Sequence, residues 1–178
     1  MYPVEETLRG RLLIAAPSLF DYFRRTVVLV IEHTPDGAMG VVLNRESETR
    51  VAEAVPQLAG LTGDEELVRI GGPVAPHSVV ALGEFDDIAD AGTHVVGRLG
   101  TLDPDSDNES LLRLRVYAGY AGWGAGQLDG ELEQEAWVVA DADAEDPFSE
   151  DDIWSRALQR RGGAYRLLAT MPPDPSQN

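Results

Sequence analysis

The fold is decided by two glycine-rich stretches, which read HTPDGAMGVVLNR at residues 33–45 and GYAGWGAGQLD at residues 119–129. The second stretch places four glycines within eight residues, around a tyrosine and a tryptophan. Glycine at this density indicates a backbone that needs positive φ or approaches a neighbouring segment more closely than a Cβ atom allows. Neither stretch supplies a nucleophile with its base, a set of metal ligands or a phosphate-binding loop. The pair therefore points to an architecture rather than to a reaction.

Both stretches are entered through predicted strands. Residues 26–32 (TVVLVIE) are β-branched and apolar on both faces, which predicts a central strand. The Pro-Asp-Gly sequence at 35–37 predicts a turn into a second strand over 38–43, giving a hairpin at the heart of a sheet. Residues 112–120 predict another strand, which feeds a glycine-rich turn and a helix over 126–135.

The remaining chain alternates short strands and helices. Ser149 and Asp152 precede an amphipathic helix that contains Ile153 and stops at Gly162. Further elements are expected as strands at 12–16, 67–70, 79–82, 94–99 and 136–140, and as a short helix over 51–58 that Pro56 interrupts. This interleaving predicts an α/β (α+β-like) sandwich, in which helices pack on a mixed, largely antiparallel sheet. We expect a single domain over residues 1–178, with a loose C-terminal tail at 172–178.

Composition excludes several kinds of function. The net charge is −17, and residues 103–152 hold fifteen acidic residues against two arginines, so direct binding to nucleic acid is disfavoured. The chain has no lysine and no cysteine, which removes Schiff-base, phosphate-loop-lysine and thiol chemistry. The first residues lack a secretory signal, and no apolar run approaches the ~20 residues of a membrane span. We therefore expect a cytoplasmic protein without a membrane partner.

Several blocks, in order along nearly the whole chain, resemble the YqgE/AlgH family of bacterial proteins. These blocks are residues 10–17, 25–28, 36–40, 44–45, 71–74, 119–124, 126–128, Trp137 and 174–176 with Asn178. The resemblance implies an α/β sandwich on a mixed sheet and a soluble intracellular protein. Some members are described as transcriptional regulators, but the family has no established biochemical activity. This chain departs from the family in having Glu46 where many members have proline, and in lacking the cysteines of some members.

Asn44 and Arg45 form the first candidate site. They follow the second strand of the predicted hairpin, where an amide and a guanidinium can bind a carboxylate or phosphate. The alternative interpretation is structural: Asn44 caps the turn and Arg45 pairs with a nearby acid.

The aromatic residues of the second stretch form another candidate site. Tyr120 and Trp123 are flanked by small residues and can line a shallow apolar cleft with Met39 and the turn at Gly72 and Pro73. Such a cleft would bind a peptide, a protein partner or a small molecule. The alternative is that both rings lie in the core, as aromatic residues do in most domains.

The glycine-rich turn offers a third candidate. Backbone amides around Gly124 and Gln127, at the start of the following helix, can hold an anion. Against this, Asp129 and Glu131 already place negative charge at the positive end of that helix. The glycine spacing is not that of a dinucleotide-binding fingerprint.

Metal and triad chemistry find no support. His33, His77 and His94 are scattered, no serine lies in a nucleophile elbow, and the acidic segment 103–109 lacks the glycine and the final glutamate of a calcium loop. The sequence predicts no metal, no cofactor and no catalytic set.

Two functions remain open. The first is a non-catalytic protein that acts by binding a protein partner or a small ligand, and regulates indirectly without contacting DNA. Its expected binding residues are Asn44, Arg45, Gly72, Pro73, Tyr120, Trp123, Gly124 and Gln127. The alternative is a hydrolase or transferase acting on a small anionic substrate at the Asn44/Arg45 strand end, with His33 or Asp36 as acid or base.

Overall fold

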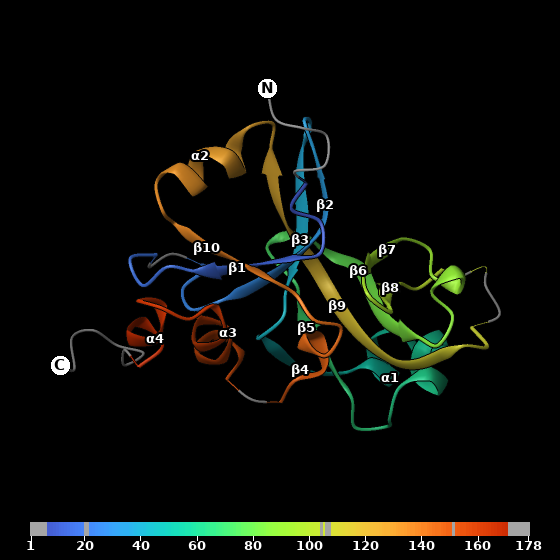
Figure 1. Ribbon diagram of the computed structural model, residues 1–178. Helices are drawn as coiled ribbons and strands as arrows, with labels where there is room; N and C mark the ends of the chain where they lie inside the picture. Colours follow the sequence, from blue (N-terminus) through green and yellow to red (C-terminus); the bar gives the residue numbers. More distant parts are fainter. Residues whose placement is uncertain (1–6, 20–21, 104, 106–107, 151, 171–178) are drawn as a thin grey trace.

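The computed structural model describes residues 7–19, 22–103, 105, 108–150 and 152–170, so the predicted tail at 172–178 lies outside the described residues. Its main feature is one extended sheet with short helices on its two faces (Figure 1). The strands are β1 (Arg11–Ala15), β2 (Val27–Thr34), β3 (Gly37–Val42), β4 (Glu46–Arg50), β5 (Leu67–Ile70), β6 (Val74–Phe85), β7 (His94–Val96), β8 (Leu99–Thr101), β9 (Leu111–Gly124) and β10 (Trp137–Asp141).

The strand order is β10-β1-β2-β3-β9-β6-β8-β7, with β5 joining β4 to β9. Among the strand pairs of the described residues, only β5 and β9 run parallel. The expectation of a mixed, largely antiparallel sheet packed with helices is therefore confirmed. The helices are α1 (Val51–Ala54), α2 (Gln127–Glu133), α3 (Ile153–Arg161) and α4 (Tyr165–Leu168), with 3-10 turns η1 (Pro56–Leu61), η2 (Ile88–Asp90) and η3 (Asp146–Phe148).

The hairpin of β2 and β3 lies in the middle of the strand order, as the sequence predicts. The first five residues of β2 are buried, which explains why they are apolar on both faces. A Cβ atom on Gly40 would lie 2.5 Å from the Leu29 carbonyl oxygen of the neighbouring strand. This close approach explains one glycine of the first stretch.

The second stretch differs from the prediction. The strand does not end at Tyr120 but continues to Gly124, so most of the expected turn is strand β9. Gly119 has φ +73°, and a Cβ atom there would lie 2.4 Å from the Gly72 carbonyl oxygen. Gly119 thus allows the backbone of β9 to lie in direct contact with the backbone at Gly72. The turn before α2 consists only of Ala125 and Gly126.

Three other local predictions change. The predicted strand at 94–99 is two short strands, β7 and β8, because the chain turns at Gly97 with φ +55°. Helix α3 begins at Ile153 and is capped by Asp152, whose carboxylate accepts from the Ser155 N–H at 3.2 Å; Ser149 is not its cap. Strand β4 was not predicted, because its sequence (ESETR) has no apolar residue. Helix α4 was not predicted either, and it is only four residues long.

The core is divided by the sheet. One cluster packs α3, through Trp154 and Leu158, against β1, β2 and β10. On the other face, Leu128 of α2 packs with the indoles of Trp123 and Trp137. A third cluster lies under α1 around Val51. No helix of the described residues is both long and apolar enough to cross a membrane.

Candidate functional site

Asn44 and Arg45 are held by the polar corner that precedes β2. The Asn44 side-chain amide donates to the Arg25 carbonyl at 2.9 Å, and its oxygen accepts from the Val27 N–H at 3.0 Å. Arg45 donates to the Tyr22 carbonyl and lies over the Tyr22 ring, 4.4 Å from its centroid. Both side chains therefore have intramolecular partners.

Trp123, Gly124 and Gln127 belong to one hydrogen-bond network. Trp123 is only 7% exposed, and its indole N–H donates to the carboxylate of Glu131 at 3.1 Å. The Trp137 indole donates to the same oxygen at 2.8 Å. The Gln127 side chain accepts from the Gly124 N–H and donates to Glu131, both at 3.0 Å. These contacts fasten α2 to the sheet.

Tyr120 lies on the other face of the sheet from Trp123. The two residues are three apart in a regular part of β9, and side chains alternate between faces along a strand. Tyr120 packs against the cluster that includes α3, whereas Trp123 belongs to the cluster that includes α2. The structure therefore does not bring the two rings into one cleft.

The predicted partners of Tyr120 do lie near it. Val74, which is exposed, is its register partner, and Met39 is the register partner of Gly122, two positions along. Pro73 is exposed in the turn that leads into β6. Gly72 is buried, and a Cβ atom there would lie 2.1 Å from the Tyr120 carbonyl carbon. This half of the predicted site is a small apolar surface.

The predicted acid and base, His33 and Asp36, lie at the turn of the β2–β3 hairpin, at the opposite end of β3 from Asn44 and Arg45. His33 uses Nδ1 to accept the Leu8 N–H at 2.9 Å, and Asp36 is exposed in the hairpin turn. Within the described ranges, no group of three or more histidine, aspartate or glutamate side chains is arranged to hold a metal ion.

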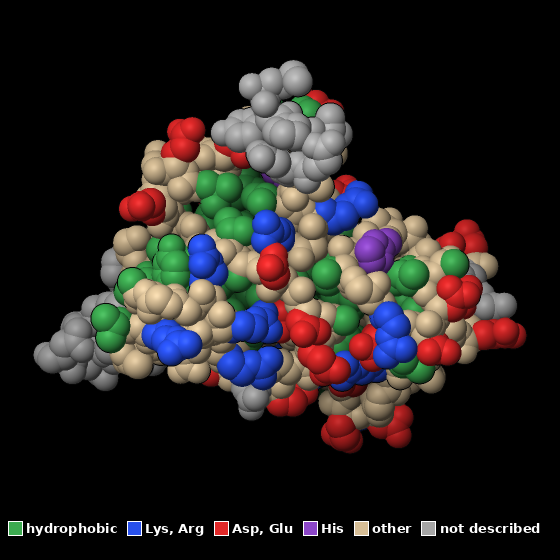
Figure 2. Space-filling view, viewed as in Figure 1, with side chains coloured by type: hydrophobic (Ala, Val, Ile, Leu, Met, Phe, Trp, Pro, Cys, Tyr) green, Lys and Arg blue, Asp and Glu red, His purple; other side chains and the backbone are tan. Residues whose placement is uncertain are grey.

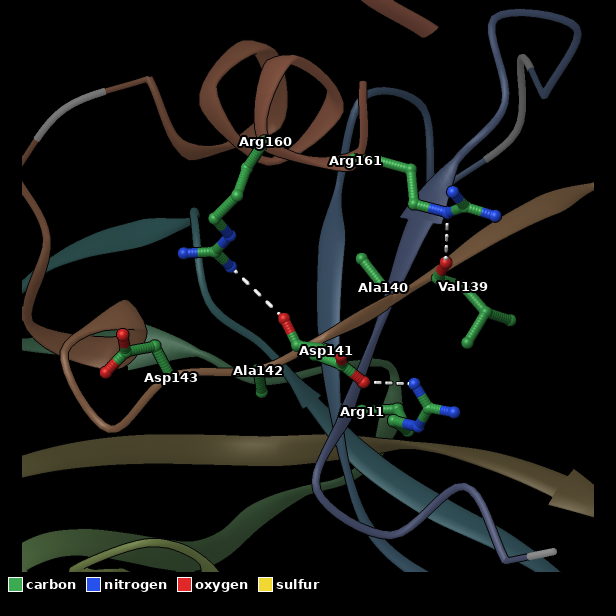
Figure 3. A pocket seen from close by; sticks show the side chains of 8 residues that line it. All are labelled: Arg11, Val139, Ala140, Asp141, Ala142, Asp143, Arg160 and Arg161. Carbon is green, nitrogen blue, oxygen red and sulfur yellow. Dashed lines mark hydrogen bonds and ion pairs between the residues drawn. The ribbon is translucent and has the colours of Figure 1, made fainter. Parts of the chain in front are cut away.

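Sequence reasoning missed an open cavity of about 700 Å³ at the edge of the sheet (Figure 3). Its floor is strand β10, and its rim comes from the end of α3 and from the start of β1. The lining residues are Arg11, Val139, Ala140, Asp141, Ala142, Asp143, Arg160 and Arg161. We call this cavity the β10 groove.

The backbone of β10 faces the groove at alternate residues. The Ala16 N–H donates to the Ala136 carbonyl, and in an antiparallel ladder every second residue bonds the same neighbour. Val139 and Asp141 therefore direct their carbonyls away from β1. Arg161 Nε donates to the Val139 carbonyl at 3.1 Å, and Arg160 Nη2 donates to the Asp141 carbonyl at 3.3 Å (Figure 3).

The three arginines of the groove differ in their acidic partners. Arg160 makes two hydrogen bonds to the buried carboxylate of Asp146, at 3.0 and 2.9 Å, and these bonds raise the pKa of Arg160. Arg11 pairs with Asp141. Arg161 has no ion pair with any described residue, and besides its backbone contact it only stacks on the Tyr165 ring at 5.2 Å. Its two Nη groups are thus available to a ligand.

The side of the groove formed by α3 is rich in arginine, in contrast to the acidic chain as a whole. Residues 153–170 contain four arginines and no acidic residue, in a chain of net charge −17. Figure 2 shows arginine side chains gathered over the region where β10 and α3 lie in Figure 1. This run of arginines is the signal by which the sequence marks the groove. An anionic group can bind there through guanidinium N–H donors.

The comparisons with known proteins agree with this sheet-dominated α/β fold. The chain belongs to the AlgH-like family, whose model it matches over residues 12–166. A UPF0301 protein of Mycobacteroides abscessus is 40% identical over 191 residues, covering 100% of this chain and 92% of its relative. A UPF0301 protein of Thermobifida fusca is 41% identical, and the match covers 97% of this chain and 96% of that relative.

Two solved structures share the architecture. A crystal structure of a Corynebacterium diphtheriae protein superposes with a TM-score of 0.85 at 31% identity, covering 96% of this chain and 95% of the other. The solution structure of the AlgH protein from Pseudomonas aeruginosa gives a TM-score of 0.70 at 28% identity. The match covers 97% of this chain and 98% of the AlgH chain. The resemblance found in the sequence motifs is thereby confirmed.

Proposed function

We propose that this protein acts by binding rather than by catalysis, and that its ligand is a small anionic molecule held in the β10 groove. The observation that carries the proposal is Arg161, an exposed guanidinium without an acidic partner among the described residues, at a cavity of about 700 Å³. Small-molecule sites are commonly ~300–1,000 Å³ in volume. A regulatory role would then be indirect, through the bound ligand, because the net charge of −17 opposes binding to DNA.

The groove supplies two kinds of donor to such a ligand. The Nη groups of Arg161 can form a bidentate contact with a carboxylate or phosphate. The register also turns the N–H groups of Val139 and Asp141 away from β1, toward the groove. Asp143 and the exposed carboxylate of Asp141 oppose a ligand of high negative charge. The site therefore favours one or two anionic groups on a larger polar molecule.

The test is a thermal-shift screen of wild type, Arg161→Gln and Arg98→Gln against citrate, a sugar phosphate and a mononucleotide. Arg98→Gln is the matched control, because Arg98 is also exposed and lies near the opposite end of the strand order. A ligand at ~100 times its Kd adds ~2.7 kcal/mol to the stability of the folded state. We expect a shift in wild type and in Arg98→Gln that is lost in Arg161→Gln.

The other outcomes are equally informative. A shift that survives in Arg161→Gln would place the ligand elsewhere and overturn the assignment to the groove. The absence of any shift would exclude these small anions and favour a protein partner that presents an acidic side chain, to be tested by titrating a labelled poly-glutamate peptide.

A further inference from the structure

A second group of charged side chains lies at the junction of β5 and β9, away from the β10 groove. Arg69 on β5 and Tyr117 on β9 are register partners in adjacent parallel strands. Arg115 lies two residues before Tyr117 and so shares its face of the sheet. Arg69 is 6% exposed, Arg115 is 6% exposed and Tyr117 is fully buried. We call these three side chains the β5–β9 cluster.

Arg115 is fully engaged. It pairs with the carboxylates of Glu66 and Glu150 and donates to the carbonyls of Pro147 and Phe148, at 3.2 and 3.4 Å. Burial disfavours its charged form, but the hydrogen bonds and the nearby charges of the two glutamates outweigh that cost and raise the pKa of Arg115. This arginine has the contacts expected of a structural ion pair.

Arg69 and Tyr117 are not engaged in this way. Neither Arg69 Nε nor the Tyr117 hydroxyl has a hydrogen-bond partner among the described residues. The Nη atoms of Arg69 lie 3.9 Å from the carboxylates of Glu46 and Glu150, which is beyond hydrogen-bond distance. Buried donors are almost always paired, because an unpaired one costs roughly 1–3 kcal/mol and more when it is charged. Each of these two donors, on neighbouring strands, therefore lacks the acceptor that a buried donor ordinarily has.

The acceptor can reach Arg69 from the solvent side. The Glu46 side chain is 50% exposed, so water solvates it and it can turn away at little cost, whereas Glu150 stays paired with Arg115. An incoming anion would take the place of a carboxylate that lies 3.9 Å from the Arg69 guanidinium, and its oxygens would lie at hydrogen-bond distance. The charge balance of Arg69 would be kept.

From this geometry we propose that the β5–β9 cluster is a binding site for one small oxyanion, a phosphate or a carboxylate group. One oxygen of the anion accepts from Arg69 Nε and a second from an Arg69 Nη. The Tyr117 hydroxyl donates to one of the same oxygens. This site is independent of the β10 groove and takes a smaller group.

The experiment measures thermal melting of the full chain in sodium phosphate or sodium acetate, against sodium chloride at equal ionic strength. The variants are Tyr117→Phe, which removes only the hydroxyl, and Arg69→Lys, which keeps the charge and removes the paired donors. In chloride, Tyr117→Phe should melt at or above the temperature of wild type, because it removes an unpaired buried donor. In phosphate or acetate, wild type should gain stability, with about tenfold weaker apparent affinity in both variants.

A third variant tests the displaced carboxylate. Glu46→Gln removes a negative charge 3.9 Å from Arg69, leaves both carboxylate partners of Arg115 in place and should bind the anion more tightly than wild type. The Nε resonance of Arg69 in a nitrogen-15 spectrum, assigned from Arg69→Lys, should shift when the anion is added. It should shift equally in Arg161→Gln, because the β10 groove is a separate site.

Two results would overturn the proposal. Equal gains in wild type and Tyr117→Phe would show that the hydroxyl does not contact the anion. No gain for either salt, with an unmoved Nε resonance, would show that water alone satisfies the two donors. Neither result bears on Arg161, so failure here is distinguishable from failure of the groove proposal.

Discussion

The carboxylate of Glu131 connects more of the structure than any other single side chain of α2. It accepts both indole N–H groups of Trp123 and Trp137 and the amide of Gln127. Its partners are neutral, and no ion pair among the described residues includes it. Glu131 therefore stabilises the fold by accepting hydrogen bonds from donors that would otherwise be buried between α2 and the sheet without an acceptor.

Removing this acceptor should be costly. We expect Glu131→Ala to lower the free energy of unfolding by about 2–5 kcal/mol, because two indole donors lose their partner. Glu131→Gln keeps an acceptor oxygen and should lose about half as much or less. Urea unfolding followed by circular dichroism measures both. Equal losses in the two variants would mean that the negative charge, rather than the acceptor, stabilises the network.

Tyr117 gives the protein a specific sensitivity to alkali. Burial raises the pKa of Tyr117 above its usual value of 10, although Arg69 and Arg115 oppose the shift. In the unfolded chain the phenol ionises from about pH 10, while in the folded protein it stays protonated, so the unfolded state is favoured as pH rises. The contribution of Tyr117 is complete below pH 10 and is lost above it.

The expected slope can be measured. Wild type should lose up to about 1.4 kcal/mol of stability per pH unit from this residue above pH 10. Tyr117→Phe should flatten the decline by that amount in urea unfolding between pH 9 and 11. Parallel declines in the two proteins would show that Tyr117 ionises equally easily in both states.

At the scale of elements, β9 is the strand that connects the two halves of the sheet. It pairs with β3, β5 and β6, and its approach to the turn before β6 needs Gly119. The φ of +73° and the 2.4 Å distance from a Cβ atom to the Gly72 carbonyl both exclude a larger residue.

Gly119→Ala should therefore destabilise the fold by roughly 2–4 kcal/mol, from backbone strain and overpacking together. Gly60→Ala is the control, because a Cβ atom there meets nothing within 4 Å and the change should stay below about 1 kcal/mol. Guanidinium unfolding of both proteins makes the comparison. If Gly119→Ala were as stable as the control, the backbones of β9 and the 71–73 turn would have to separate easily.

The elements that the sequence predicts well are those with a continuous apolar run or an apolar periodicity. The β2–β3 hairpin, β10 and α3 carry this signal, and each lies where it was expected. The end of β9 was misplaced because glycine marks turns and close backbone contacts alike. Strand β4 was missed because its side chains are polar, and only pairing with β5 makes it a strand.

The sites were harder to predict, because they depend on which side chains face each other. Trp123 and Tyr120 are only three residues apart but lie on opposite faces of the sheet, which the exact strand register decides. The β10 groove joins Arg11 to Arg161, and the β5–β9 cluster joins Arg69 to Tyr117. In both cases the residues are far apart in the sequence and no motif contains both of them, so the sequence alone does not show that they are neighbours.

At the scale of the whole molecule, the net charge of −17 lowers the stability of the folded state. Acidic side chains repel one another in the compact state, and salt screens this repulsion, with a Debye length of ~10 Å at 0.1 M. Exposed ion pairs such as Arg98–Asp86 lose strength in salt, but each contributes only about 0–1 kcal/mol.

The melting temperature should consequently rise by several degrees between roughly 0.02 and 0.5 M sodium chloride, as screening removes this repulsion. Differential scanning calorimetry measures the effect, and potassium chloride should give the same curve if screening rather than a specific ion is responsible. A fall in melting temperature would mean that attractive pairs outweigh the repulsion.

The pairing of β1 with β10 has a consequence for synthesis of the chain. Leu13 of β1 pairs with Val139 of β10, 126 residues later. At a translation rate of about 5–20 residues per second, β1 waits roughly 6–25 s for this neighbour after it leaves the ribosome. During that interval its apolar edge is open to other nascent chains and to chaperones. The last strand to be made is therefore the one that ends the exposure of the first.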